Sequence, residues 1–214
     1  MKRVVVYLDF VSPYAYLAFE RLPQALEGLS YAVEYRPILF AGLLKQWGQK
    51  GPAEIEPKRA WTFRQVHWLA QRDSIRLDTP ARHPFNPLAL LRLGWACAPA
   101  GGTPNRRVVE ALFHHVWHGG ADANDTERLF DLTLRLAPSL DATSEAVKQR
   151  LRQATEAALA LGVFGVPTFE AGGRLFWGAD SLPMLSAALC GDPWFDGPAW
   201  DREGAPRPGI QRRA

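Results

Sequence analysis

The sequence contains little cysteine, and the two cysteines it has are far apart. They are Cys97 and Cys190 in a chain of 214 residues, and they form no C-x-x-C pair. A redox site of the C-x-x-C type is thereby excluded. Disulfides persist mainly in oxidising compartments, so we expect a cytoplasmic protein with ordinary thiols.

Long apolar runs and a strong charge of one sign are also missing. No segment approaches the roughly 20 apolar residues that a membrane-spanning helix needs. The apolar run after Met1-Lys2-Arg3 meets Asp9 too early to be typical of a signal peptide. The formal net charge is only +3, and part of the arginine excess lies in the C-terminal tail. We therefore predict no membrane partner and no nucleic-acid partner.

The composition is that of a soluble globular protein. Hydrophobic residues make up 47% of the chain, charged residues make up 22%, and there are eight tryptophans. This is enough material for one large domain or for two intimately joined ones.

The stretch from Val4 to Ala18 predicts a buried strand followed directly by a helix. A short run of valines and aromatics stops at Ser12-Pro13, where a helical apolar pattern begins. Serine is a favoured N-cap and proline suits the first helical position. Ser12 is thus expected at the positive end of the helix dipole, where an anion would meet a hydroxyl and several free amides. The alternative is that Ser12 only caps the helix.

Strand patterns occur only near the two ends of the chain. An N-terminal βαβ unit ends at Pro37, helical patterns follow through Gly162, and two strands flank Gly172-Gly173 before a last helix capped by Asp180 and Ser181. This order predicts an α/β, thioredoxin-like fold with a large all-helical insertion between βαβ and ββα. We expect residues 1–38 and 162–191 to form the thioredoxin-like domain, 39–161 the helical insertion domain and 192–214 an irregular tail.

Pro167 stands at the very start of a predicted strand. Proline cannot donate to a strand ladder, so it must occupy a special place there. A cis Val166-Pro167 bond would turn the backbone of Val166 outward, free to pair with an extended peptide-like ligand. An ordinary trans proline at a strand edge is the alternative, and the place of Pro167 in this fold favours cis.

Four segments together resemble the 2-hydroxychromene-2-carboxylate isomerases, which are relatives of the kappa-class glutathione transferases. The resemblance runs from about residue 3 to residue 190. The segments are Phe10–Ala18, the loop through Gly48-Gln49-Lys50 and Pro57-Lys58-Arg59, Phe164–Phe169, and Trp177–Ser181.

The resemblance implies a glutathione site. Ser12 would donate a hydrogen bond to the thiolate, and Val166 would pair its backbone with the cysteinyl unit. Asp180 and Ser181 would hold the γ-glutamyl amine and carboxylate. Gln49 stands where many relatives carry asparagine.

The resemblance also implies a small aromatic substrate and a homodimer. Lys58 would meet the glycine carboxylate of glutathione or the substrate carboxylate, and Lys45 is the second candidate for the substrate. Asn86 resembles a family asparagine near the substrate. The implied reaction interconverts 2-hydroxychromene-2-carboxylate and trans-o-hydroxybenzylidenepyruvate, as in aromatic hydrocarbon catabolism.

Other functions remain open at this point. A disulfide oxidoreductase would need an attacking thiolate at the turn that Ser12-Pro13-Tyr14-Ala15 occupies. His114, His115 and His118 have helical spacing suited to a metal, but no further ligand motif accompanies them, so we predict no metal. A kappa-like transferase acting on other electrophiles, and a non-catalytic glutathione- or peptide-binding module, would use the same cleft. Likewise Asp180, Ser181, Lys58 and Asn86 could be ordinary cap, surface and turn residues.

Overall fold

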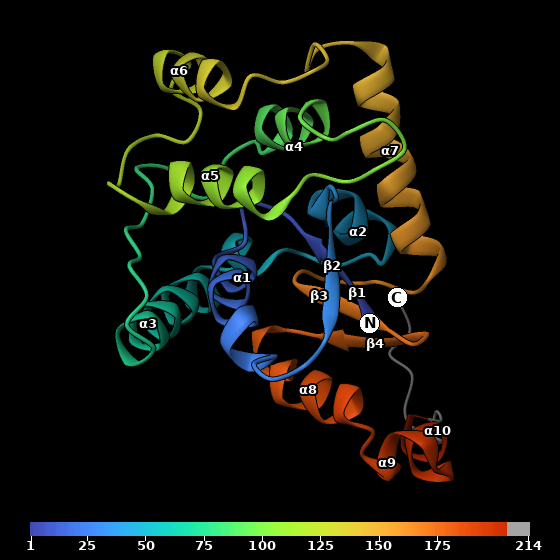
Figure 1. Ribbon diagram of the computed structural model, residues 1–214. Coiled ribbons are helices and arrows are strands. Elements are labelled where there is room, and N and C mark those ends of the chain that lie inside the picture. The colour runs from blue at the N-terminus through green and yellow to red at the C-terminus, as the bar shows by residue number, and fades with distance from the viewer. Residues whose placement is uncertain (205–214) are drawn as a thin grey trace.

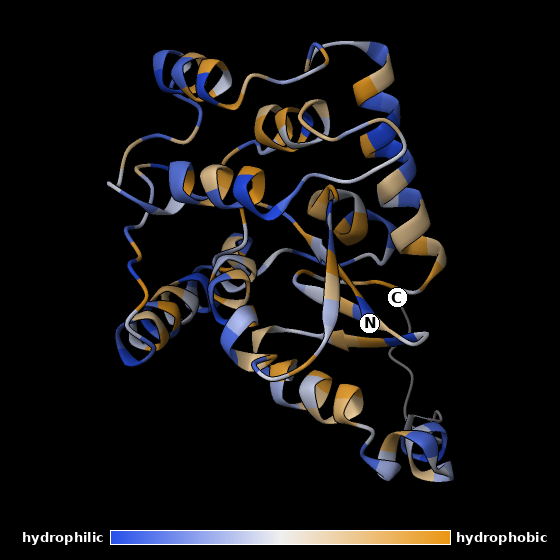
Figure 2. Ribbon diagram, in the orientation of Figure 1, coloured by the Kyte–Doolittle hydropathy of each residue, from blue (hydrophilic) through white to orange (hydrophobic). Residues whose placement is uncertain are grey.

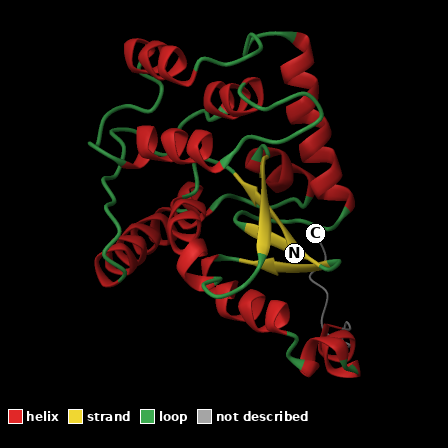
Figure 3. Cartoon of the chain, in the orientation of Figure 1, coloured by secondary structure: helices red, strands yellow, loops and turns green. Residues whose placement is uncertain are grey.

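The centre of the fold is a four-stranded sheet (Figure 3). The computed structural model describes residues 1–204. The strands are β1 (Lys2–Leu8), β2 (Tyr31–Pro37), β3 (Thr168–Ala171) and β4 (Arg174–Trp177), in the order β2-β1-β3-β4. β1 pairs in parallel with β2 and antiparallel with β3, and β3 pairs antiparallel with β4. The predicted thioredoxin-like order is thus confirmed.

Helices cover both faces of the sheet (Figure 1). Along β1, Val4, Val6 and Leu8 share a core with α1 (Pro13–Ala25) and α8 (Leu182–Cys190). Val5 and Tyr7 instead pack with residues of α2 (Phe40–Gln46) and α7 (Glu145–Ala160). Alternate side chains of a strand point to opposite faces. The continuous apolar run of β1 therefore contributes side chains to the core on each face of the sheet.

The predicted helical insertion is present between β2 and β3. It comprises α2, α7, the 3₁₀ turn η1 (Pro52–Glu54), α3 (Glu56–Arg72), α4 (Leu88–Ala96), α5 (Arg106–Trp117) and α6 (Thr126–Leu136). α4 contacts both α5 and α7, whereas α3 contacts α1. Side-chain N-caps begin three of these helices, since Asn105, Asp125 and Ser144 each accept from the amide three residues further on.

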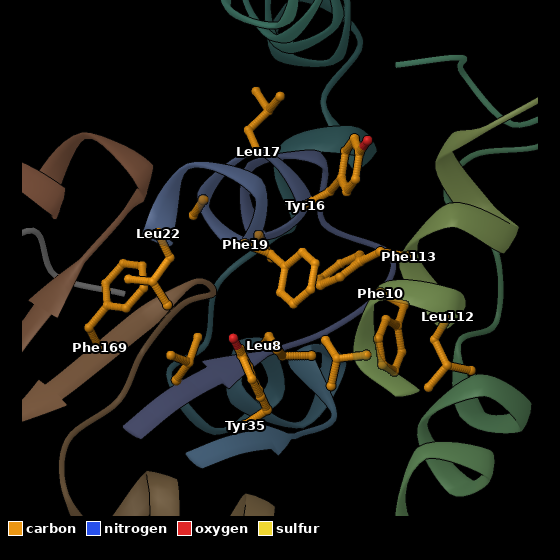
Figure 4. Packing of buried hydrophobic residues seen from close by; sticks show 14 of the residues in the cluster. Leu8, Phe10, Tyr16, Leu17, Phe19, Leu22, Tyr35, Leu112, Phe113 and Phe169 are labelled. Carbon is orange, nitrogen blue, oxygen red and sulfur yellow. The ribbon is translucent and has the colours of Figure 1, made fainter. Parts of the chain in front are cut away.

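The insertion shares its core with the sheet and α1. Phe113 of α5 lies between Phe10 and Phe19, with ring centroids 5.0 Å and 5.3 Å away (Figure 4). The indole N–H of Trp117 also donates to the carbonyl of Phe10, at 3.1 Å. The core of the helical insertion is therefore continuous with the core of the sheet and α1. The domain boundaries drawn from the sequence stay a prediction.

The tail after Gly191 was predicted to be irregular, and this is wrong for residues 193–204. They form two short helices, α9 (Pro193–Asp196) and α10 (Pro198–Gly204). Asp192 caps α9 by accepting from the amide of Trp194, and buried Phe195 packs on Phe176 of β4. Helices this short show no period that a sequence pattern could reveal. The rest of the predicted tail, residues 205–214, lies outside the described residues.

Hydropathy varies strongly between helices (Figure 2). α8 is mostly hydrophobic, whereas α3 is mostly hydrophilic and buries only Val66 and Ala70 completely. Within residues 1–204, no helix combines the length and the apolar character needed to cross a bilayer.

Candidate functional site

The site is centred on Ser12, in the turn from β1 to α1. Its hydroxyl accepts from the amide of Ala15 at 3.2 Å, which confirms the predicted N-cap. The same hydroxyl donates to the carbonyl of Val166, 3.4 Å away and 154 residues along the chain. The structure therefore brings together the two segments that the sequence analysis singled out.

The Val166-Pro167 peptide bond is cis, as predicted. The loop around it is held by two hydrogen bonds, from the amide of Gly178 to the carbonyl of Pro167 and from the hydroxyl of Thr168 to the carbonyl of Gly165. Among the described residues, no acceptor is bonded to the Val166 amide N–H. That amide is thus free to pair with an extended ligand.

Gly165 allows an aromatic side chain to lie directly on this loop. A Cβ at Gly165 would lie 2.5 Å from Nε1 of Trp177. The ring of Trp177 also contacts Phe164, with centroids 4.9 Å apart. Any side chain at position 165 would therefore displace the indole.

Asp180 and Ser181 lie in a 3₁₀ turn, η2 (Ala179–Ser181), which contacts α1. Ser181 is the N-cap residue of α8, as predicted, and Asp180 precedes it. No side-chain cap bond forms at α8, because the Ser181 hydroxyl donates to the carbonyl of Gly178 instead. The Asp180 carboxylate is exposed and close enough to α1 to raise the pKa of Tyr14.

The other predicted ligands lie at the surface. Lys45 is in the last turn of α2, Gln49 in the following loop and Lys58 in the first turn of α3. Asn86 is also exposed, and its side chain accepts from the amide of Leu88 to form the turn before α4. In the described part of the chain, no hydrogen bond or ion pair joins these four residues to Ser12 or Val166, so their roles stay predictions.

Asp9 is a residue of this site whose place the sequence did not reveal. Its side chain is fully buried, and its two oxygens accept from the amides of Val11, at 3.2 Å, and Phe40, at 2.9 Å. Burial raises its pKa from 3.8 to about 7, against the opposing effect of these hydrogen bonds. An acid inside an apolar strand was the one available signal.

Tyr14 and Gln65 form a second pair that the sequence did not predict. The Tyr14 hydroxyl donates to Oε1 of Gln65, which bridges α1 and α3 near the Ser12 turn. Tyr14 is half-buried, and burial raises the pKa of its hydroxyl. Gln65 carries no sequence signal, because it is one polar residue on a mostly polar helix.

His83 also binds the Ser12 turn, at the residue before Ser12. Its Nε2 lies 2.8 Å from the carbonyl of Val11, so this nitrogen carries the donated proton. The ring packs edge-on against Phe63, and burial lowers the pKa of the imidazole. The His83-Pro84 bond is also cis, which the sequence did not predict.

The three histidines at the C-terminal end of α5, of which His118 is the C-cap, bind separate partners. His114 lies 3.0 Å from a carboxylate oxygen of Glu20, and His115 lies 2.9 Å from the carbonyl of Ala123. His118 lies 2.9 Å from the hydroxyl of Tyr16. Within residues 1–204, no three histidine, cysteine or acidic side chains are grouped so that they could hold a metal ion.

The arrangement suits a thiolate. A helix N-terminus and a hydroxyl donor favour the ionised form of a sulfur placed beside them, and can bring a thiol pKa near 8.5 below 7. The free Val166 amide offers a backbone partner next to that position.

The chain is similar to known proteins over most of its length. Residues 3–190 match the family model described as a DSBA-like thioredoxin domain. The chain is 31% identical to a 2-hydroxychromene-2-carboxylate isomerase of Pseudomonas putida, over 86% of this chain and 92% of that protein. It is 25% identical to glutathione S-transferase kappa 1 of Rattus norvegicus, over 89% and 91% of the two chains.

A solved structure supports the same grouping. That structure is of a 2-hydroxychromene-2-carboxylate isomerase, and it superposes with a TM-score of 0.77 at 27% identity. The match covers 91% of this chain and 97% of that one.

Proposed function

This chain belongs to the DsbA-like thioredoxin-domain family, among the 2-hydroxychromene-2-carboxylate isomerases and kappa-class glutathione transferases, and we propose that it is a glutathione-dependent isomerase. The proposed reaction interconverts 2-hydroxychromene-2-carboxylate and trans-o-hydroxybenzylidenepyruvate. The observation that carries the proposal is the Ser12 hydroxyl, placed at the N-terminus of α1 and 3.4 Å from the carbonyl of Val166.

The residues present fit glutathione. Ser12 would turn its hydroxyl from the long bond with Val166 toward the sulfur, and the free amide of Val166 would pair with the cysteinyl backbone. The exposed carboxylate of Asp180 would bind the γ-glutamyl amine. Ser181 is the second γ-glutamyl residue in this proposal, and its hydroxyl would exchange the carbonyl of Gly178 for the γ-glutamyl carboxylate.

When bound, glutathione supplies a thiolate whose reversible addition to the conjugated ketone makes the C=C bond single, so that the bond can rotate. Ser12 stabilises negative charge on the sulfur before addition and after release. A cation must face the substrate carboxylate. Lys58 is our first candidate and Lys45 the second, with Asn86 beside the substrate and Gln49 on glutathione.

A transferase of the kappa type is the second candidate function. The similarity to the rat kappa-class enzyme favours it, and the same Ser12 turn would serve it. The two functions differ in what happens to glutathione, because an isomerase regenerates it and a transferase consumes it.

Turnover at limiting glutathione tests the proposal. We expect isomerisation of many substrate molecules per glutathione, and binding of S-methylglutathione without turnover. Stoichiometric consumption of glutathione would favour the transferase. Isomerisation at an equal rate without glutathione, or no binding at millimolar glutathione in calorimetry, would overturn the proposal. The cytoplasmic location and the homodimer stay predictions, and sedimentation analysis measures the second.

A further inference from the structure

Tyr14 carries a hydroxyl that the proposed roles leave unused. It lies two residues after Ser12 in the first turn of α1, and its side chain reaches across to Gln65 of α3. We propose that Tyr14 is a further catalytic residue, whose hydroxyl donates to the ketone oxygen of the substrate as charge develops there. This rests on the proposed function.

The reaction requires such a donor. Addition of a nucleophile to a conjugated ketone moves an electron pair to the ketone oxygen, and expulsion of the nucleophile moves it back. A preorganised donor at that oxygen stabilises the transition state of both steps. Ser12 cannot be this donor, because its single proton is directed at the sulfur. No proton is transferred, so the hydroxyl of Tyr14 stays intact through the cycle.

The surroundings of Tyr14 keep the hydroxyl protonated. Burial raises its pKa above the ordinary value of 10, against the opposing effect of a hydrogen bond with Thr62, and the negative charge of Asp180 acts in the same direction as burial. The bond to Gln65 also fixes the ring, since the side-chain amide oxygen accepts from the hydroxyl. Gln65 is thus a positioning residue for the free enzyme. When substrate binds, the ketone oxygen would replace Gln65 as the acceptor of the Tyr14 hydroxyl.

Tyr16 is a matched control on the same helix. Its ring is buried, and its hydroxyl donates to the carbonyl of Arg76 at 2.6 Å and lies 2.9 Å from Nε2 of His118. These partners lie in the segments that follow α3 and α5, whereas Tyr14 reaches Gln65 within α3. Tyr16→Phe therefore removes a hydroxyl from α1 without touching the Ser12 turn.

Two glutathione conjugates separate this role from the glutathione site itself. S-(3-oxo-3-phenylpropyl)glutathione places a ketone at the spacing from sulfur that the reaction creates, and S-(3-phenylpropyl)glutathione lacks only that oxygen. Calorimetry on the full chain would compare wild type, Tyr14→Phe and Tyr16→Phe. We expect Tyr14→Phe to bind the ketone conjugate about three- to tenfold more weakly, as for one lost hydrogen bond, with unchanged affinity for the other conjugate.

Each outcome bears on one claim. Equal affinities of Tyr14→Phe and wild type for the ketone conjugate would overturn the role of Tyr14 and leave the glutathione site standing. Equal weakening of both conjugates would show a structural role only. If wild type bound neither conjugate, the glutathione site would fall, and the role of Tyr14 with it. In the isomerase assay, Tyr14→Phe should lower kcat with little change in KM, and Tyr16→Phe should change neither.

Discussion

At the residue scale, the Ser12 hydroxyl has two partners that differ in what they stabilise. The bond from the Ala15 amide supports the helix, whereas the proton directed toward Val166 is available to a ligand. A substitution at Ser12 therefore removes a helix cap and a hydrogen-bond donor together. A substitution at a second serine that only caps a helix measures the first loss alone.

Ser12→Ala should lower turnover by about 10²-fold or more, the scale for losing one preorganised donor. It should also cost about 1 kcal/mol of unfolding free energy as a lost N-cap. Ser144 caps α7 in the same way, at 3.4 Å from the amide of Val147. Ser144→Ala should show a similar stability loss with normal turnover, measured by denaturant unfolding and steady-state kinetics. Equal turnover in both variants would leave Ser12 as a cap only.

Asp9 should make the unfolding free energy depend on pH. Its pKa is raised from 3.8 to about 7 by burial. Between about pH 4 and 7 the folded chain keeps a proton that the unfolded chain has lost, so this group makes stability fall as pH rises. Asp9→Asn removes that contribution, which is at most about 1.4 kcal/mol per pH unit for one proton.

The effect of Asp9 must be measured as a difference between wild type and Asp9→Asn, because three histidines change the unfolding free energy with pH in the opposite direction. His83, His115 and His118 have lowered pKa values, so they destabilise the folded chain as pH falls through their range. Urea unfolding of wild type and Asp9→Asn from pH 4 to 8 should show the stability of wild type falling relative to that of Asp9→Asn as pH rises toward 7. Parallel curves would contradict a titrating Asp9.

At the element scale, α3 packs beside the site but is not a core helix, because it buries only Val66 and Ala70 completely. It contacts α1 along Gln65, and it exposes Trp61 and Trp68, at 62% and 59% of their surfaces. Trp61 is one turn before Gln65, on the side toward Lys58. Trp68 lies further along the helix, and the Arg72 guanidinium stacks over it at 5.2 Å.

Trp61→Ala should raise KM for an aromatic substrate severalfold, because ring stacking contributes about 1 kcal/mol. Trp68→Ala removes the same area at nearly the same exposure and should leave KM unchanged. Steady-state kinetics at saturating glutathione measures both. Equal effects of the two substitutions would show that the aromatic surface of α3 acts as a whole, without a ring site at Trp61.

At the scale of the whole molecule, residues 193–204 fold back onto the sheet. Phe195 is buried against Phe176, with ring centroids 5.9 Å apart, and Arg174 of β4 donates to the carbonyl of Phe195 at 2.7 Å. The segment thus covers the edge strand on the side of α8. These residues contact β4. The Ser12 turn is formed by other elements, namely β1, α1 and the Val166 loop.

Phe195→Ala should lower the unfolding free energy by about 3 kcal/mol, the usual cost of emptying a buried phenylalanine site. Affinity for glutathione should not change, because Phe195 packs on β4 whereas the Ser12 turn is formed by β1, α1 and the Val166 loop. Trp194→Ala is the control, since Trp194 is adjacent and partly exposed. Thermal unfolding with and without glutathione measures both properties, and a loss of affinity in Phe195→Ala would show that the tail supports the site.

Local chemistry was sufficient to predict the elements of this protein from its sequence. Alternation and apolar runs identified the strands, helical spacing and capping residues identified the longer helices, and two glycines marked the hairpin. The Ser12 turn was predictable for the same reason, since serine before proline acts on its immediate neighbours. The cis Val166-Pro167 bond was predicted only from the place of Pro167 in the expected fold.

Only the tertiary structure decided which distant groups meet. Gln65 reaches Tyr14 because α3 packs on α1, and Asp9 is buried because α2 begins over the end of β1. Residues 193–204 pack on the sheet because Phe195 contacts Phe176 of β4. These contacts depend on how surfaces fit together in space, whereas sequence periodicity records only which side of one element is apolar.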